Sequence, residues 1–178
     1  MFENRPEKKT RRLFLPLLCA AAIFCGLRAT AVYAASELPG DEELERPRFV
    51  SLRSDLVNMR EGPSTEHGIK WVYHRQGLPV QVLAEYDVWR RVRDMDGEVG
   101  WIHVSLLSND RGALVTGTGY AEVRADEGAE APIIAEVEPG VVGRIESCGP
   151  ASCRLDFSTM EGWVARTRIW GVYADEQF

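Results

Sequence analysis

The two cysteines of the C-terminal half, Cys148 and Cys153, are the residues best placed for thiol chemistry. A thiol pair can act as a redox couple, bind zinc or form a structural disulfide. Their spacing is wider than that of the C-x-x-C redox motif, and neither a histidine nor a second cysteine pair lies nearby in the sequence to complete a zinc site. The pair flanks a Gly-Pro-Ala-Ser turn, so a disulfide across a hairpin is the favoured interpretation for an oxidising compartment.

The other residue types that commonly catalyse reactions form no recognisable motif in this sequence. His67, His74 and His103 lack the paired spacing of metal ligands, and no serine lies in a G-x-S-x-G setting. Acidic turns at residues 94–98 and at Asp126–Glu127 offer a weak calcium site, although the solvated chemistry of ordinary turns explains them better. We therefore expect no catalytic residue, no metal site and no cofactor. A divergent hydrolase that uses an unrecognised acid pair is the alternative from another class.

An internal repeat organises the segments that carry these residues. Val57–Arg60 matches Ala121–Arg124, and Gly100–Ile102 matches Gly162–Val164. Further matches lie between these anchors in the same order, which is hard to obtain by chance. The chain therefore contains two copies of one structural unit.

Each copy has the pattern of short β-strands. Apolar and polar residues alternate through Leu78–Leu83 and Trp89–Arg93 in the first copy, and through Cys153–Phe157 in the second. Turn-forming residues separate these runs, and no stretch sustains apolar residues at helical spacing. A few short strands bury a core only when their sheet curls into a barrel. We therefore predict an all-β protein made of two tandem small barrels.

These motifs resemble the bacterial SH3 domain. The first copy shows the resemblance in the strand Val57–Arg60 with the Glu-Gly-Pro-Ser that follows it, in Trp89–Val92 and in Gly100–Leu107. The second copy matches through fewer residues, among them Gly162–Val164, and a serine precedes Cys153 where a tryptophan is expected. The whole chain resembles exported proteins of Gram-negative bacteria, of the alphaproteobacterial type, that carry two such domains. The resemblance implies two SH3-like barrels and an adaptor or targeting function.

The resemblance also implies a binding groove formed by exposed aromatic residues. In barrels of this kind, such residues can hold an extended or proline-rich peptide. Tyr86 and Trp89 flank a turn where side chains can stand clear of the core, which makes them the leading candidates. The complete candidate groove in the first copy consists of Tyr86, Trp89, Trp71, Tyr73 and Arg60.

Core packing is the alternative interpretation for each tryptophan, because a small barrel has little other apolar area to bury. Trp101 and Trp163, which follow a glycine in both copies, are expected in the core, whereas Trp89 fits either place. Arg60 and its counterpart Arg124 could bind a carboxylate of a ligand, but pairing with a neighbouring acid is favoured.

Residues 1–34 have the three-part organisation of a secretory signal peptide. Basic residues precede the apolar stretch Leu13–Leu27, and small residues lead to a cleavage site after Ala34. The stretch is shorter than the roughly 20 residues that cross a bilayer, so we expect no stable membrane insertion after cleavage. The expected location is the periplasm, or the medium after secretion. The predicted segments are the signal peptide 1–34, a flexible acidic lead-in 35–47, barrel 1 at 48–110, a linker 111–119, barrel 2 at 120–173 and a tail 174–178.

The charge of the chain narrows the choice of partners. Its 21 basic and 27 acidic residues give a formal net charge of −6, and removal of the basic residues within 1–34 makes the remainder more acidic. Such a surface repels nucleic acid and anionic lipid, which disfavours a nucleic-acid role. The resemblance implies a peptidoglycan peptide as the partner. Peptidoglycan is itself partly anionic, which favours the alternative of an extended segment from another envelope protein.

Overall fold

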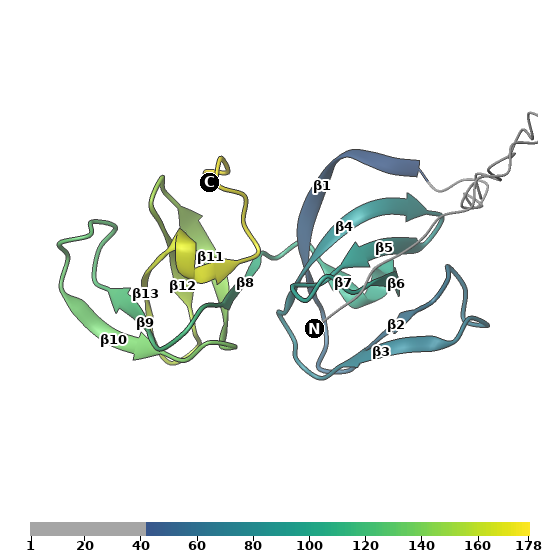
Figure 1. Cartoon of the computed structure of the whole chain (residues 1–178), viewed down its shortest axis with the longest axis horizontal. Helices are drawn as coiled ribbons and strands as arrows, with labels where there is room; N and C mark the ends of the chain where they lie inside the picture. The colour runs from purple at the N-terminus through teal and green to yellow at the C-terminus, as the bar shows by residue number, and fades with distance from the viewer. Residues whose placement is uncertain (1–41) are drawn as a thin grey trace, which may run out of the picture. The chain divides into compact units, whose positions relative to one another are not determined.

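Residues 42–178, which the computed structural model describes, form two antiparallel sheets of seven strands each (Figure 1). The predicted signal peptide lies outside these residues. The first sheet contains β1 (Glu42–Leu52), β2 (Val57–Arg60), β3 (Ile69–Tyr73), β4 (Pro79–Tyr86), β5 (Trp89–Arg93), β6 (Val99–His103) and β7 (Leu107–Ser108), with the 3-10 helix η1 (Val104–Leu106) before β7. The second sheet contains β8 (Gly112–Val115), β9 (Ala121–Arg124), β10 (Ile133–Val137), β11 (Val142–Cys148), β12 (Ser152–Asp156), β13 (Glu161–Ala165) and β14 (Ile169–Trp170), with η2 (Arg166–Arg168) before β14.

The two sheets share one topology. The strand order is β3-β2-β6-β5-β4-β1-β7 in the first sheet and β10-β9-β13-β12-β11-β8-β14 in the second. The counterpart of each strand therefore lies seven labels further along the chain. This confirms the predicted all-β fold and the tandem repeat.

Alternation of side chains builds the core of the first barrel. In β2, Val57 and Met59 are fully buried, whereas Asn58 and Arg60 are partly exposed. Successive side chains of a strand point to opposite faces of the sheet, so a period of two places one apolar set inside the barrel. The cluster is completed by other buried residues of neighbouring strands, among them Leu52, Val80, Val82, Val92 and Ile102.

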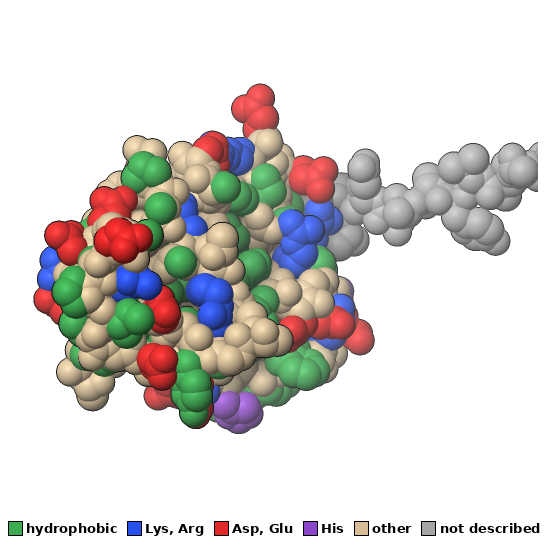
Figure 2. Space-filling model, turned by 60° about the vertical axis from the view of Figure 1, so that its left-hand side comes forward, with side chains coloured by type: hydrophobic (Ala, Val, Ile, Leu, Met, Phe, Trp, Pro, Cys, Tyr) green, Lys and Arg blue, Asp and Glu red, His purple; other side chains and the backbone are tan. Residues whose placement is uncertain are grey.

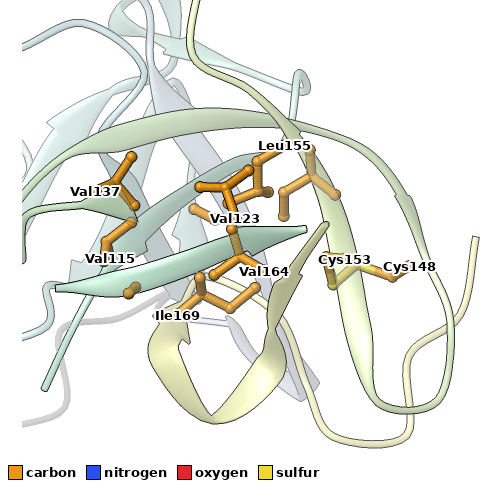
Figure 3. Packing of buried hydrophobic residues seen from close by; sticks show 11 residues of the cluster. Val115, Val123, Val137, Cys148, Cys153, Leu155, Val164 and Ile169 are labelled. Carbon is orange, nitrogen blue, oxygen red and sulfur yellow. A yellow bond between two sulfur atoms is a disulfide. The ribbon is translucent and has the colours of Figure 1, made fainter. Parts of the chain in front are cut away.

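The second barrel has an equivalent core that includes the disulfide. Val123, Leu155 and Val164, on β9, β12 and β13, are fully buried and belong to one cluster (Figure 3). The predicted disulfide is confirmed: Cys148 and Cys153 are register partners on β11 and β12, with an S–S distance of 2.01 Å. The bond therefore closes a hairpin at the edge of a packed core.

The segment expected as a linker, residues 111–119, contains a strand of the second barrel. β8 pairs with β11 and with β14, and its residues Ala113, Leu114 and Val115 are buried. A short apolar run beside a sheet gains backbone hydrogen bonds and buries its side chains, so it joins the sheet instead of spanning solvent. The connection between the two sheets is confined to residues 109–111.

The expected flexible lead-in, residues 35–47, also differs in its described part. Residues 42–47 belong to β1, which pairs with β4 from Glu42 onwards. The register of this pairing shifts between Glu43 and Arg48, which indicates a bulge. Backbone pairing with β4 therefore orders the part of this acidic segment that lies within β1.

The C-terminal residues contact both barrels. Trp170 lies edge-on to Phe49 of β1, with ring centroids 5.0 Å apart, and the hydroxyl of Tyr173 donates to the carbonyl of Pro47 at 2.9 Å. Arg111, between the sheets, forms a bidentate ion pair with Glu176. The hydrogen bond from Arg111 lowers the pKa of the Glu176 carboxyl below its ordinary value.

Candidate functional site

The leading groove candidates of the first barrel pack inward. Trp89 is only 8% exposed and lies edge-on to His103, with ring centroids 5.4 Å apart. Tyr86 is half-buried and contacts Trp101 edge-on at 6.4 Å. Trp101 itself is 5% exposed, as expected for a core residue. These aromatic side chains therefore cover one another, and Trp89 leaves little surface for a ligand because it serves the packing of the barrel.

Tyr73, another candidate, is a structural residue of the first core. It is 6% exposed, and its hydroxyl donates to Asp94 Oδ2 at 2.8 Å. Burial, together with the hydrogen bond to Asp94 and the charge of that carboxylate, raises the pKa of the tyrosine above its ordinary value. The other oxygen of Asp94 accepts a hydrogen bond from the backbone of Glu98, so this carboxylate organises its own turn. Trp71, by contrast, is 52% exposed on β3.

Arg60 and Arg124 have one role in both barrels. Arg60 Nη1 donates to the carbonyl of His67 at 2.7 Å, and Arg124 Nη1 donates to the carbonyl of Ala131 at 2.6 Å. Each arginine therefore ties the loop that follows its strand back to the sheet. Arg124 also pairs with Glu122, in line with the favoured interpretation of a neighbouring acid.

The second barrel carries an open pocket at the position equivalent to that of Trp89, Trp101 and His103 in the first barrel. Its volume is about 350 Å³, and it lies over Trp163 of β13. Tyr120, which is 58% exposed, borders it beside β9, and Ser152 and Ala165 line it from β12 and β13. We call this site the Trp163 pocket. Trp163 was expected in the core, but it is only half-buried and faces this opening.

Cross-strand pairs explain why the second barrel is open and the first is not. Trp89 pairs with His103 across β5 and β6, and the counterpart pair across β12 and β13 is Ser152 with Ala165. Two large rings are thus replaced by two small side chains beside the shared tryptophan position. The missing bulk leaves Trp163 partly exposed. The serine before Cys153 was the sequence signal that could have located this pocket.

The rim of the Trp163 pocket mixes positive and negative charges. Arg124, Arg168, Glu122 and Glu127 all line it. The Arg168 guanidinium donates to backbone carbonyls of the loop at residues 116–120, at distances of 2.8 to 3.3 Å. Acidic, basic and hydrophobic side chains are likewise interspersed on the face shown in Figure 2. Such a surface suits a ligand that has both apolar and polar groups, as a peptide has.

Other reactive residue types serve local structure. Nδ1 of His67 contacts Ser64 Oγ at 2.9 Å, and Nδ1 of His103 contacts Ser105 Oγ at 2.7 Å. Among residues 42–178, no group of three or more histidine, cysteine or acidic side chains could hold a metal ion. The same part of the chain has no helix long and apolar enough to cross a membrane.

Two solved structures from Trichomonas vaginalis are similar to this chain. The structure of NlpC1 matches with a TM-score of 0.32 and 14% identity, over 71% of this chain and 46% of its own length. The structure of NlpC2 matches with a TM-score of 0.33 and 14% identity, over 75% of this chain and 51% of its own length. The chain thus spans about half the length of these two proteins.

A known domain family matches the sequence of both barrels. No curated protein matches the chain. The sequence model of the bacterial SH3 domain matches residues 53–109 and, again, residues 118–171. The two matched ranges contain β2 to β7 and β9 to β14, which have identical strand order. The chain therefore belongs to the bacterial SH3 domain family, with two tandem copies of the domain.

Proposed function

We propose that this chain is a non-catalytic binding module of the bacterial cell envelope, which recognises a peptidoglycan peptide in the Trp163 pocket. The observation that carries this proposal is the partly exposed Trp163 in a pocket of about 350 Å³. This volume lies within the range of roughly 300–1,000 Å³ that is typical of small-ligand sites. An aromatic ring gives a ligand a large contact area at low cost in conformational entropy. Barrel 2 thus takes the role that the sequence suggested for barrel 1.

An extracytoplasmic location forms part of the proposal. The three-part N-terminal pattern supports export to the periplasm. The Cys148–Cys153 bond supports the same location, because disulfides persist in oxidising compartments. A non-catalytic role is supported by the residues themselves, since the cysteine pair is bonded and His67 and His103 contact neighbouring serines.

The proposal is tested by co-sedimentation of the exported, oxidised protein with insoluble peptidoglycan sacculi at physiological salt. Tyr120→Ala removes an exposed aromatic residue of the pocket rim without touching the core. Trp71→Ala is the matched control, because Trp71 is similarly exposed but lies on the first barrel. We expect retention of the native protein and of the Trp71 variant, and a loss of at least about five-fold for the Tyr120 variant. Absence of retention for the native protein would overturn the proposal.

A second candidate function is a protein–protein module that binds an extended segment of another envelope protein. β3 and β10 are end strands of their sheets, and both expose large apolar side chains. The exposed residues are Ile69, Trp71 and Val72 on β3, and Ile133 and Ile134 on β10. An end strand with such side chains can accept an added strand from a partner. Binding that depends on Trp71 and not on Tyr120 would favour this candidate.

A further inference from the structure

Glu127 lines the Trp163 pocket, and its carboxylate lies against Gly149 of the β11–β12 turn. Glu127 is a half-buried residue of the loop between β9 and β10. Ser152 Oγ donates to the backbone carbonyl of Glu127 at 3.1 Å, which ties this loop to β12. Within residues 42–178, the Glu127 carboxylate accepts no hydrogen bond and forms no ion pair. Its acceptor capacity is therefore available to a ligand.

A glycine in the β11–β12 turn gives this carboxylate its place. A Cβ at position 149 would lie 1.6 Å from Glu127 Oε1, so a larger residue than Gly149 would displace the carboxylate. The neighbouring residues Ala151 and Ser152 line the same pocket. The turn and the loop together hold Glu127 at the pocket wall.

The two arginines of the rim are already engaged by the protein. Arg124 pairs with Glu122 and donates to the carbonyl of Ala131. Arg168 directs Nε, Nη1 and Nη2 to carbonyls of the loop at residues 116–120. A carboxylate of a ligand thus finds few donors here, whereas a ligand donor finds the acceptor oxygens of Glu127.

The aromatic residues of the pocket favour a cation as well. Trp163 and Tyr120 both line it, and tryptophan is the aromatic ring that attracts an ammonium group most strongly. The net charge of −6 adds a long-range attraction for positive groups. Hydrogen bonding, ring electrostatics and net charge therefore select the same kind of ligand.

We propose that the Trp163 pocket selects a residue with a free ammonium group, which donates a charge-assisted hydrogen bond to Glu127. This inference rests on the proposed function, because it names the part of the wall peptide that is recognised. In such a peptide the group is the side-chain amine of a diamino acid that is not cross-linked. The protein thereby distinguishes open from cross-linked wall peptides, since cross-linking converts the amine into a neutral amide.

The test uses three preparations of the same sacculi: untreated, acetylated at free amines, and reductively methylated at free amines. Acetylation removes the positive charge, whereas methylation keeps it. We expect acetylation to weaken binding of the native protein roughly ten-fold, and methylation to leave most of the binding intact. Glu127→Gln should bind all three preparations at the weak level. Glu130→Gln, an exposed glutamate of the same loop outside the pocket lining, is the matched control and should behave like the native protein.

The outcomes separate this inference from the proposed function. Equal binding of the native protein to untreated and acetylated sacculi would overturn the ammonium inference and leave wall binding intact. A Glu127→Gln variant that stays sensitive to acetylation would overturn the role of Glu127. Absence of binding to all three preparations would overturn the proposed function itself.

Discussion

The two barrels share one strand order and use equivalent positions in different ways. In the first, Trp89 and His103 pair beside Trp101, which is 5% exposed. In the second, Ser152 and Ala165 form the counterpart pair, and the pocket over Trp163 is open. The same fold thus covers the shared tryptophan in one copy and leaves it half-buried beneath an open pocket in the other. The comparison shows that a repeat can keep its topology while only one copy keeps the shared tryptophan covered.

Covalent stabilisation differs at equivalent positions too. Glu85 and Arg90 are register partners on β4 and β5, and their side chains form an ion pair at 3.3 Å. The corresponding partners on β11 and β12 are the disulfide-bonded Cys148 and Cys153. The first barrel holds this hairpin with charges next to large aromatic residues. The second barrel, which has small residues beside the turn, holds it with a covalent bond.

The glycine that precedes the shared tryptophan in both copies gives the largest expected effect on the free energy of unfolding. A Cβ on Gly100 would lie 2.7 Å from the carbonyl oxygen of Arg60, and a Cβ on Gly162 would lie 2.8 Å from that of Arg124. Because a backbone atom cannot move aside cheaply, we expect Gly100→Ala and Gly162→Ala each to lower the free energy of unfolding by about 3 kcal/mol. Urea denaturation measures this. Gly128→Ala, where a Cβ meets no atom within 4 Å, is the control and should change little.

Removing the link that joins the β11–β12 hairpin and the one that joins the β4–β5 hairpin should lower the free energy of unfolding by smaller and unequal amounts. The loop closed by the disulfide is short, so replacing both cysteines by alanine should lower the free energy of unfolding by about 2 kcal/mol. Glu85→Gln removes the counterpart ion pair and a second one with Arg48, both partly exposed, and should together cost about 0.5–1 kcal/mol. Thermal unfolding of the oxidised proteins compares the two. An equal loss in both variants would contradict the difference argued here.

Alkaline pH should affect the first barrel alone through Tyr73. Its counterpart in the register of β9 and β10 is Val137, which does not ionise. Because burial and Asp94 raise the pKa of folded Tyr73 above the unfolded value of about 10, its contribution to stability is complete below that pH and falls as the pH rises further. We expect a loss of about 1 kcal/mol at pH 11. In Tyr73→Phe this part of the pH dependence should disappear, as unfolding titrations between pH 8 and about 11 would show.

The sequence was sufficient for the architecture because the signals are local or repeated. Alternation in Val57–Arg60 places buried residues correctly, and matching glycine–tryptophan pairs mark the two copies. The strand β8 was missed because it is short and lies between polar residues. The repeat extends to it, however: Val50 and Leu52 of β1 correspond to Ala113 and Val115 of β8, and all four are buried.

The location of the groove was harder to predict because it depends on cross-strand neighbours. An aromatic residue beside a turn can point outward or be covered, and the size of its register partner decides between the two. For Trp89 that partner is His103, and both rings pack together. For Trp163 the neighbouring small pair is visible only once β12 and β13 are aligned. From the sequence, Glu127 belongs only to an acidic turn, because its link to Ser152 joins segments that are distant in the sequence.

The most direct test of the central claim copies the closed site of the first barrel into the second. The double variant Ser152→Trp with Ala165→His recreates the Trp89–His103 pair beside Trp163. Binding to peptidoglycan sacculi would be measured as a function of protein concentration, with urea denaturation as the check on folding. We predict a folded protein that binds at least about ten-fold more weakly than the native one. A folded double variant that binds as tightly as the native protein would contradict the assignment of the Trp163 pocket as the binding site.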